Sequence, residues 1–151
     1  MIGDMQSWTP NVAGIIEHAK KVHPKTEIIS RLVSGEIHRS NYEEVCIRSR
    51  KLASVLEKDG YKEGDVLATL ALNTYRHLEM YYGISGMGGI THTLNFRLHP
   101  EQAVYIINHA EDKIIFVESP FVPILEAIQD QIPTVEKFIV YVMKMNCLKL
   151  L

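Results

Sequence analysis

The sequence predicts an α/β fold with a mainly parallel sheet. Three near-continuously apolar runs, at 66–72, 113–118 and 138–142, are typical of strands covered on both faces. Segments with helical periodicity separate these runs. Strands that alternate with helices indicate βαβ units with right-handed crossovers, so we expect one sheet with helices on its faces.

An N-terminal helix and a β-hairpin are predicted before the alternating region. Apolar residues recur through 12–22 at the spacing of an amphipathic helix, which Pro24 ends. Two strands, 27–33 and 36–39, flank a tight turn at Ser34-Gly35. Ser40 and Glu43 then have the spacing of a capping box, so we expect the next helix to start there and to stop before Gly60.

A glycine cluster organises the middle of the chain, within 73–100. The predicted helix 74–88 carries three glycines near its end, and a fourth precedes a short strand at 90–94; the four are Gly83, Gly86, Gly88 and Gly89. Each glycine inside a helix costs roughly 1 kcal/mol relative to alanine. We therefore expect this helix end to lie almost against a neighbouring backbone, which only residues without a Cβ permit.

Phosphate-binding loops are the alternative interpretation of these glycines. A P-loop requires lysine after Gly88, where Gly89 stands, and a dinucleotide fingerprint requires glycine at Thr91. Both loops also open a helix, whereas these glycines close one. The packing interpretation is therefore preferred.

The remaining elements follow from proline positions and apolar runs. Pro100 is placed as the first residue of a helix over 100–109. After the strand 113–118, Ser119-Pro120 begins a helix that Pro133 closes, with Val122, Leu125 and Ile128 facing inward. The tail, 143–151, does not continue the pattern. We suspect an interrupted or shifted reading frame there, with a short C-terminal helix as the alternative.

Composition excludes several classes of protein. The chain has 151 residues, 46% of them apolar and 23% charged, as in one ordinary globular domain. A net charge of −2 without a basic block gives no support to a nucleic-acid partner. Cys46 and Cys147 match no metal or redox spacing and are expected to be reduced thiols. Residues 1–10 do not resemble a secretory signal, and no transmembrane segment is predicted, so we expect a cytoplasmic protein.

Residues at the carboxyl ends of the predicted strands are the candidate ligand contacts, because open α/β sheets bind ligands there. The alternatives are helix capping for Thr74 and Ser119, turn formation for Asn95, and for Arg97 either a pair with Glu101 or exposure to solvent. The candidates are Asn73, Thr74, Asn95, Arg97, Glu118 and Ser119.

Two other kinds of site are weighed and set aside. Four histidines lie in the organised region without the spacing of a metal site, namely His77, His92, His99 and His109. Ser85 misses the Gly-x-Ser-x-Gly elbow of hydrolases by one position and falls on a helix, so it is not expected to be a nucleophile.

Four motifs follow one another in order along the chain: Asn-Thr-x-Arg-His-Leu-Glu-x-Tyr-Tyr-Gly-x-Ser-Gly-Met-Gly (73–88), His-Thr-Leu-Asn-x-Arg-Leu (92–98), Pro-Glu-Gln (100–102) and Tyr-Ile-x-Asn-His-Ala-Glu-Asp (105–112). In these motifs the chain resembles the fatty-acid–CoA ligases, the medium- and long-chain acyl-CoA synthetases of the adenylate-forming AMP-binding superfamily. The resemblance runs from about Met5 to about Val140 and covers the N-terminal part of the family's large domain.

The resemblance implies a two-step reaction, in which ATP and a fatty acid form an acyl-adenylate and coenzyme A then takes the acyl group. It also implies ATP, Mg²⁺ and coenzyme A as cofactors of the full-length enzyme, medium- to long-chain fatty acids as substrates, and dimerisation through the N-terminal arm in some relatives. The family's Ser/Thr/Gly-rich loop with lysine, its acidic residues and its C-terminal lysine all lie downstream of residue 151. We therefore assign no catalytic, cofactor-binding or metal residue, and we expect the 151-residue chain alone to be inactive and to bind no cofactor.

Three segments are expected: an arm at 1–39, a partial AMP-binding domain at 40–142 and the atypical tail at 143–151. Two other functions remain open. One is a non-catalytic interaction or dimerisation module, because a partial sheet exposes an edge and apolar helix faces. The other is a small nucleotide-binding domain of flavodoxin-like shape, which requires a phosphate loop after a strand.

Overall fold

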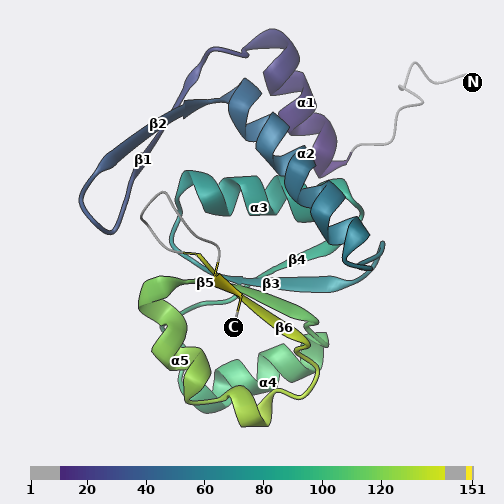
Figure 1. Ribbon diagram of the computed structural model, residues 1–151, viewed down its shortest axis with the longest axis vertical. Helices are drawn as coiled ribbons and strands as arrows, with labels where there is room; N and C mark the ends of the chain where they lie inside the picture. The colour runs from purple at the N-terminus through teal and green to yellow at the C-terminus, as the bar shows by residue number, and fades with distance from the viewer. Residues whose placement is uncertain (1–10, 142–148, 151) are drawn as a thin grey trace, which may run out of the picture.

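The computed structural model describes residues 11–141 and 149–150 (Figure 1). The helices are α1 (Val12–Val22), α2 (Tyr42–Lys58), α3 (Tyr75–Gly86), α4 (Pro100–Ala110) and α5 (Val122–Glu126), with 3₁₀ turns η1 (Ser119–Phe121) and η2 (Gln129–Gln131). The strands are β1 (Glu27–Arg31), β2 (Ile37–Asn41), β3 (Val66–Leu70), β4 (Ile90–Thr93), β5 (Ile114–Glu118), β6 (Lys137–Tyr141) and β7 (Lys149–Leu150).

A mainly parallel sheet forms the centre, as predicted. Its strand order is β4-β3-β5-β6-β7; the first four strands run parallel, and β7 pairs antiparallel with β6. Helices α2 and α3 lie on one side of the sheet, and α4 and α5 lie on the other (Figure 1). All five residues of β5 are buried, as expected for a strand covered on both faces.

Alternate residues of β5 enter two different cores. Ile114 and Phe116 pack with residues of α2 and α3, including Leu56. Ile115 and Val117 pack with residues of α4 and α5 on the opposite face. The period-2 geometry of a strand therefore explains why the sequence of β5 is apolar at every central position.

The hairpin and α1 lie above the sheet on the α3 side (Figure 1). Strands β1 and β2 pair antiparallel around the predicted turn, where Gly35 has a φ of +87°. Helix α1 packs through Ile16 against Val45 and Cys46 of α2. The Cys46 thiol is buried and donates to a Glu17 carboxylate oxygen at 3.3 Å, and burial raises the pKa of that thiol.

The predicted capping box at Ser40 is wrong by one residue. Strand β2 extends to Asn41, because Ser40 and Asn41 still pair with Ile28 and Glu27 of β1. The Asn41 side chain caps α2 by accepting the Glu44 N–H at 2.9 Å. Ser40 instead lies buried in the strand, and its hydroxyl has no hydrogen-bond partner among the described residues.

The predicted helix after Ser119 is broken into short pieces. The turn η1 leads into α5, which stops at Glu126, and η2 follows. Pro123 has no backbone N–H to bond to the Ser119 carbonyl, so a continuous helix from Ser119 is interrupted between η1 and α5. Leu125 and Ile128 are buried as predicted, and Val122 is half-buried. Strand β3 also ends at Leu70, two residues earlier than predicted.

The prediction that the glycines permit close backbone contact is confirmed at Gly83 and Gly89 and is wrong at Gly86. A Cβ on Gly83 would lie 3.0 Å from the Ser49 carbonyl oxygen of α2, and one on Gly89 would lie 3.1 Å from the Ile84 carbonyl oxygen. Gly88 has a φ of +85°. Nothing lies within 4 Å of a Cβ on Gly86, so packing does not require glycine there.

Of the predicted tail, the structure describes only Lys149 and Leu150. These residues form β7 and pair with Val140 and Ile139 of β6, so the short helix considered above does not include them. Val142, Cys147 and the rest of the tail lie outside the described residues, as does the N-terminal part of the predicted arm. Within the described residues, no helix has the length and apolar character needed to cross a membrane.

Candidate functional site

An open groove of about 700 Å³ lies where strands β3 and β4 end. The hairpin strand β1 and the first half of α3 form its other walls. We call it the edge groove. It contains Asn73, Thr74 and Asn95, three of the predicted contact residues, among apolar neighbours that include Ile28, Leu72, Leu78, Tyr81 and Phe96.

The three predicted residues in the edge groove have mainly structural roles. Thr74 is the N-cap residue of α3, but it caps through its backbone: its carbonyl accepts the Leu78 N–H at 3.1 Å, and its buried hydroxyl has no partner among the described residues. Asn95 forms the expected turn, because its side-chain oxygen accepts the Arg97 N–H at 3.0 Å. Asn73 is exposed at the mouth of the groove.

The other three candidates do not line the edge groove. Arg97 is exposed, and its guanidinium packs 5.4 Å from the centre of the Phe96 ring instead of pairing with Glu101. Glu118 is fully buried and accepts the Leu72 N–H at 2.8 Å. Burial raises the pKa of this carboxyl. Ser119 begins η1 without a side-chain cap.

His77 is a residue of the edge groove that sequence reasoning missed as a groove contact. Its Nε2 atom lies 3.0 Å from the Thr69 hydroxyl of β3, and burial lowers its pKa, so the neutral ring is favoured. The sequence could have indicated this contact, because His77 lies in the first turn of a helix that follows a buried strand. Such turns border the carboxyl edge of a sheet.

The chemistry available in the edge groove is limited. The residues that line it include no lysine, arginine, aspartate or glutamate. A triphosphate requires cationic or helix N-terminal donors, and Mg²⁺ requires carboxylate or carbonyl oxygens. Apart from the first turn of α3, the groove is lined mainly by uncharged and apolar groups, and it lacks the charged side chains that hold a nucleotide.

The histidines and Ser85 make local contacts. His92 Nδ1 lies 2.9 Å from both oxygens of the buried Asp112 carboxylate. His109 is exposed and stacks on Tyr105. The Ser85 hydroxyl lies 3.1 Å from the Thr91 hydroxyl. The described part of the chain contains no group of three or more His, Cys, Asp or Glu residues that could hold a metal ion.

A mainly parallel sheet with helices on both faces and a groove at its carboxyl edge defines an open α/β domain. The sequence model of the AMP-binding enzyme family matches residues 16–149, which is most of the chain. The chain belongs to this family.

Curated relatives share the sequence over nearly the whole chain. It is 44% identical to the medium-chain-fatty-acid–CoA ligase of Ectopseudomonas oleovorans and 42% identical to the 3-methylmercaptopropionyl-CoA ligase of Ruegeria lacuscaerulensis, each match covering 92% of this chain and 26% of the relative. The long-chain-fatty-acid–CoA ligase of Thermus thermophilus is 42% identical over 86% of this chain and 24% of the relative. The chain thus spans about a quarter of the length of these relatives.

Solved structures show the same fold. An anthranilate CoA ligase in complex with anthranoyl-AMP superposes with a TM-score of 0.81 at 20% identity, over 91% of this chain and 26% of that one. A fatty acyl CoA synthetase of Mycobacterium tuberculosis superposes with a TM-score of 0.78 at 22% identity, over 87% of this chain and 26% of that one. The predicted resemblance to acyl-CoA ligases is confirmed, and it concerns one part of them.

Proposed function

We propose that this chain is the N-terminal part of an ATP-dependent medium- to long-chain fatty-acid–CoA ligase. The observation that carries the proposal is the identity of 42–44% to the medium-chain and long-chain ligases over most of the chain. In the complete enzyme the acid attacks ATP to form an acyl-adenylate and pyrophosphate. The thiol of coenzyme A then attacks the acyl carbon, and AMP leaves.

Within this proposal, the 151 residues supply scaffold and groove wall while other parts of the enzyme supply the charged groups. The absence of charged side chains from the lining of the edge groove supports this division. Mg²⁺, ATP and coenzyme A belong to the complete enzyme, and the chain alone binds none of them and forms no acyl-CoA. We place the enzyme in the cytoplasm, a compartment that suits the free thiol of Cys46.

A chimera tests the proposal directly. Residues 11–141 replace the matching segment of the Ectopseudomonas oleovorans ligase, and octanoyl-CoA formation is measured with ATP and Mg²⁺. We expect the chimera to form octanoyl-CoA, and we expect a control chimera with the same segment in reversed order to form none. A chimera that folds, by circular dichroism and melting temperature, yet forms no acyl-CoA from acids of any chain length would refute the proposal.

Dimerisation through the arm at 1–39 is the second part of the proposal, with a specific observation behind it. Ile29 and Ile37 are more than half exposed on the outer face of the hairpin, and Val33 at its tip is half exposed. Exposed apolar side chains on a two-stranded sheet favour pairing with another copy or another partner. This also keeps the interaction-module alternative open.

Sedimentation velocity at two protein concentrations measures that pairing. The chain is expected to dimerise, and the Ile37→Lys variant is expected to remain a monomer. Ile47→Lys, at another exposed isoleucine on α2, is the matched control and should still dimerise. A wild-type chain that stays monomeric at both concentrations excludes the arm as a dimer contact, without bearing on the ligase lineage. Limited proteolysis near residues 39–40 tests whether the arm is a separate unit.

A further inference from the structure

The hairpin of β1 and β2 forms one wall of the edge groove, because Ile28, Ile29 and Ser30 of β1 line that groove. Among the described residues, no hydrogen bond or ion pair joins the two strands of the hairpin to α3 or to the central sheet. At the base of the hairpin, the Glu43 N–H of α2 donates to the Pro24 carbonyl oxygen at 3.1 Å. The hairpin is therefore fixed at its base, and side-chain packing holds the rest of it against α3.

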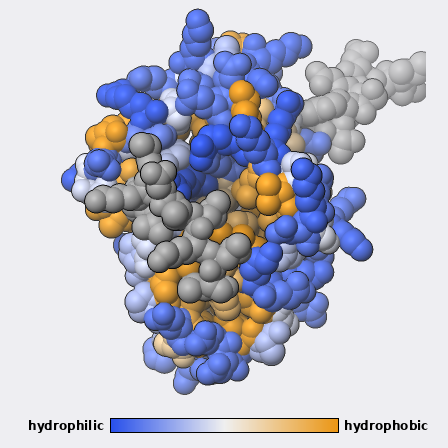
Figure 2. Space-filling view, in the orientation of Figure 1, coloured by the Kyte–Doolittle hydropathy of each residue, from blue (hydrophilic) through white to orange (hydrophobic). Residues whose placement is uncertain are grey.

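Two side chains on the inner face of the hairpin provide this packing. Ile28 packs against the small core between α1 and α2. The His38 ring of β2 stacks on the buried Tyr75 ring of α3, with 3.7 Å between the ring centres and 20° between the ring planes. Figure 2 shows mostly hydrophilic surface over the layer that the hairpin and α1 form. Three other apolar side chains of the hairpin are at least half exposed, namely Ile29, Val33 and Ile37.

The surroundings of the His38 ring disfavour a positive charge on it. From α2, the Arg48 guanidinium opposes protonation of the ring, and the Glu44 carboxylate favours it. From α3, the Arg76 guanidinium also opposes protonation. Arg76 already occupies the Tyr75 side chain, because its Nε atom donates to the Tyr75 hydroxyl at 2.9 Å and its guanidinium lies 5.5 Å from the centre of that ring. A protonated His38 ring would therefore share its stacking partner with another cation.

Two buried carboxylates reduce this repulsion without removing it. Glu79 pairs with Arg48 at 2.5 Å, and the carboxylates of Glu79 and Glu118 both act on Arg76. Burial, followed by the two arginines, still lowers the pKa of His38 below its ordinary value of 6.5. A released hairpin, whose ring is in water, binds a proton more readily than the docked one. The stability of docking is thus fully present above pH 6.5 and is lost as the pH falls through the pKa of the docked ring.

We propose that the stack of His38 on Tyr75 is an acid-sensitive latch that holds the hairpin in place as a wall of the edge groove. Protonation of His38 places a third cation beside Arg48 and Arg76, so the rings separate and the hairpin moves away from α3 about its base. The edge groove then loses its β1 wall and widens. The latch uses the inner face of the hairpin, so it is independent of pairing through the outer face and of the ligase assignment.

NMR spectroscopy of the full chain tests the latch. Nuclear Overhauser effects between the His38 and Tyr75 rings report the stack. Broadening of isoleucine δ1-methyl signals by a neutral nitroxide in solution reports exposure, since Ile28 is half-buried on the inner face, Ile29 is exposed and Ile115 is in the core. From pH 7.5 to pH 5.5, we expect the ring–ring effect to fall by about threefold or more and the broadening of Ile28 to rise to that of Ile29, with Ile115 unchanged. The same response at two protein concentrations distinguishes opening from pairing between chains.

Variants at position 38 separate the latch from other titrations. His38→Phe keeps a stacking ring that cannot be protonated, so Ile28 should stay protected at both pH values. His38→Lys carries a charge at both pH values, so Ile28 should be exposed at both. The matched control is His109→Phe, at an exposed histidine that stacks on Tyr105 of α4, on the opposite side of the sheet (Figure 1). This control should respond to pH as the wild type does.

Three results would overturn the latch: Ile28 stays protected in the wild type at pH 5.5, Ile28 and Ile115 become exposed together, or His38→Phe opens on acidification as the wild type does. The third result would assign the pH response to Glu79 or Glu118. Circular dichroism checks that each variant is folded. If His38→Phe is not, the wild type decides, because the midpoint of the His38 ring titration must then coincide with the midpoint of the change at Ile28.

Discussion

Gly83 of α3 lies directly against the Ser49 carbonyl of α2. A Cβ at Gly83 would be 3.0 Å from that oxygen and 3.0 Å from a terminal methyl group of Leu52. Both contacts are closer than ordinary van der Waals distance, and one of them involves backbone. This contact fixes how closely α3 approaches α2 and therefore where both helices lie on the sheet.

Gly83→Ala should therefore destabilise the chain by about 1–3 kcal/mol, because the added methyl overpacks a backbone contact. Gly86→Ala, three residues along the same helix, adds a methyl where nothing lies within 4 Å. That variant should be neutral or stabilise by up to about 1 kcal/mol, from the better helix propensity of alanine. Urea unfolding of the two variants checks this, and equal effects of both would show that close packing does not require glycine at position 83.

The start of α2 gives a second matched pair. Asn41→Ala removes the side-chain oxygen that accepts the Glu44 N–H, so we expect a loss of about 1 kcal/mol in the free energy of unfolding. Ser40→Ala removes a buried hydroxyl that has no partner among the described residues, so it should be neutral or stabilising. Thermal unfolding measures both. The reverse order of effects would reinstate Ser40 as the cap.

Glu118 makes the stability of the chain depend on pH. Burial raises the pKa of its carboxyl above the value of 4.5 expected in the unfolded chain. The folded protein thus holds this proton more tightly, and the stability that the neutral carboxyl provides is lost as the pH rises from below 4.5 through the folded-state pKa. The Glu118→Gln variant keeps an acceptor for the Leu72 N–H but does not ionise. Its free energy of unfolding, relative to that of the wild type, should therefore increase as the pH rises through this range.

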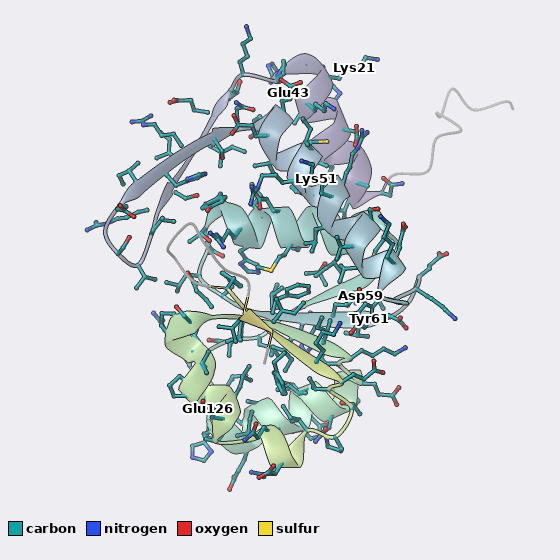
Figure 3. The ribbon with its side chains drawn as sticks, viewed as in Figure 1. Lys21, Glu43, Lys51, Asp59, Tyr61 and Glu126 are labelled. Atoms are coloured by element: carbon teal, nitrogen blue, oxygen red, sulfur yellow. The ribbon has the colours of Figure 1, made fainter. Side chains whose placement is uncertain are left out.

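Urea unfolding at pH 4 and pH 7 tests this expectation. Glu126→Gln, changed at an exposed carboxylate on α5 (Figure 3), corrects for the loss of one negative charge. A difference between Glu118→Gln and wild type that is the same at both pH values would show that the buried carboxyl does not couple folding to protonation.

The sheet could be predicted because its buried strands are continuously apolar runs that are visible in the sequence. Ile-Ile-Phe-Val in β5 enters two cores by simple alternation, and in β3 Leu67 enters one core while Ala68 and Leu70 enter the other. The start of α2 could not be fixed, because Ser40 and Asn41 are adjacent residues of the same capping class. Pairing across the hairpin, a contact distant in sequence, decides between them.

The grooves were harder to predict than the sheet, because they too depend on contacts between residues that are distant in sequence. Asn73, Thr74 and Asn95 were placed correctly, because strand ends in a parallel sheet meet at one edge. A second groove, over β5 and β6, brings Arg76 of α3 beside Tyr141 of β6, and no local pattern relates these residues. That no residue of this chain is catalytic remains a prediction.

Acyl-CoA formation by the isolated 151-residue chain is the most direct test of the central claim. The chain is incubated with octanoate or palmitate, ATP, Mg²⁺ and coenzyme A, beside the full-length Ectopseudomonas oleovorans ligase as the positive control. The account predicts no acyl-CoA above the enzyme-free blank and no AMP release. Turnover by the purified chain would show that a complete site exists within these residues and would contradict the account.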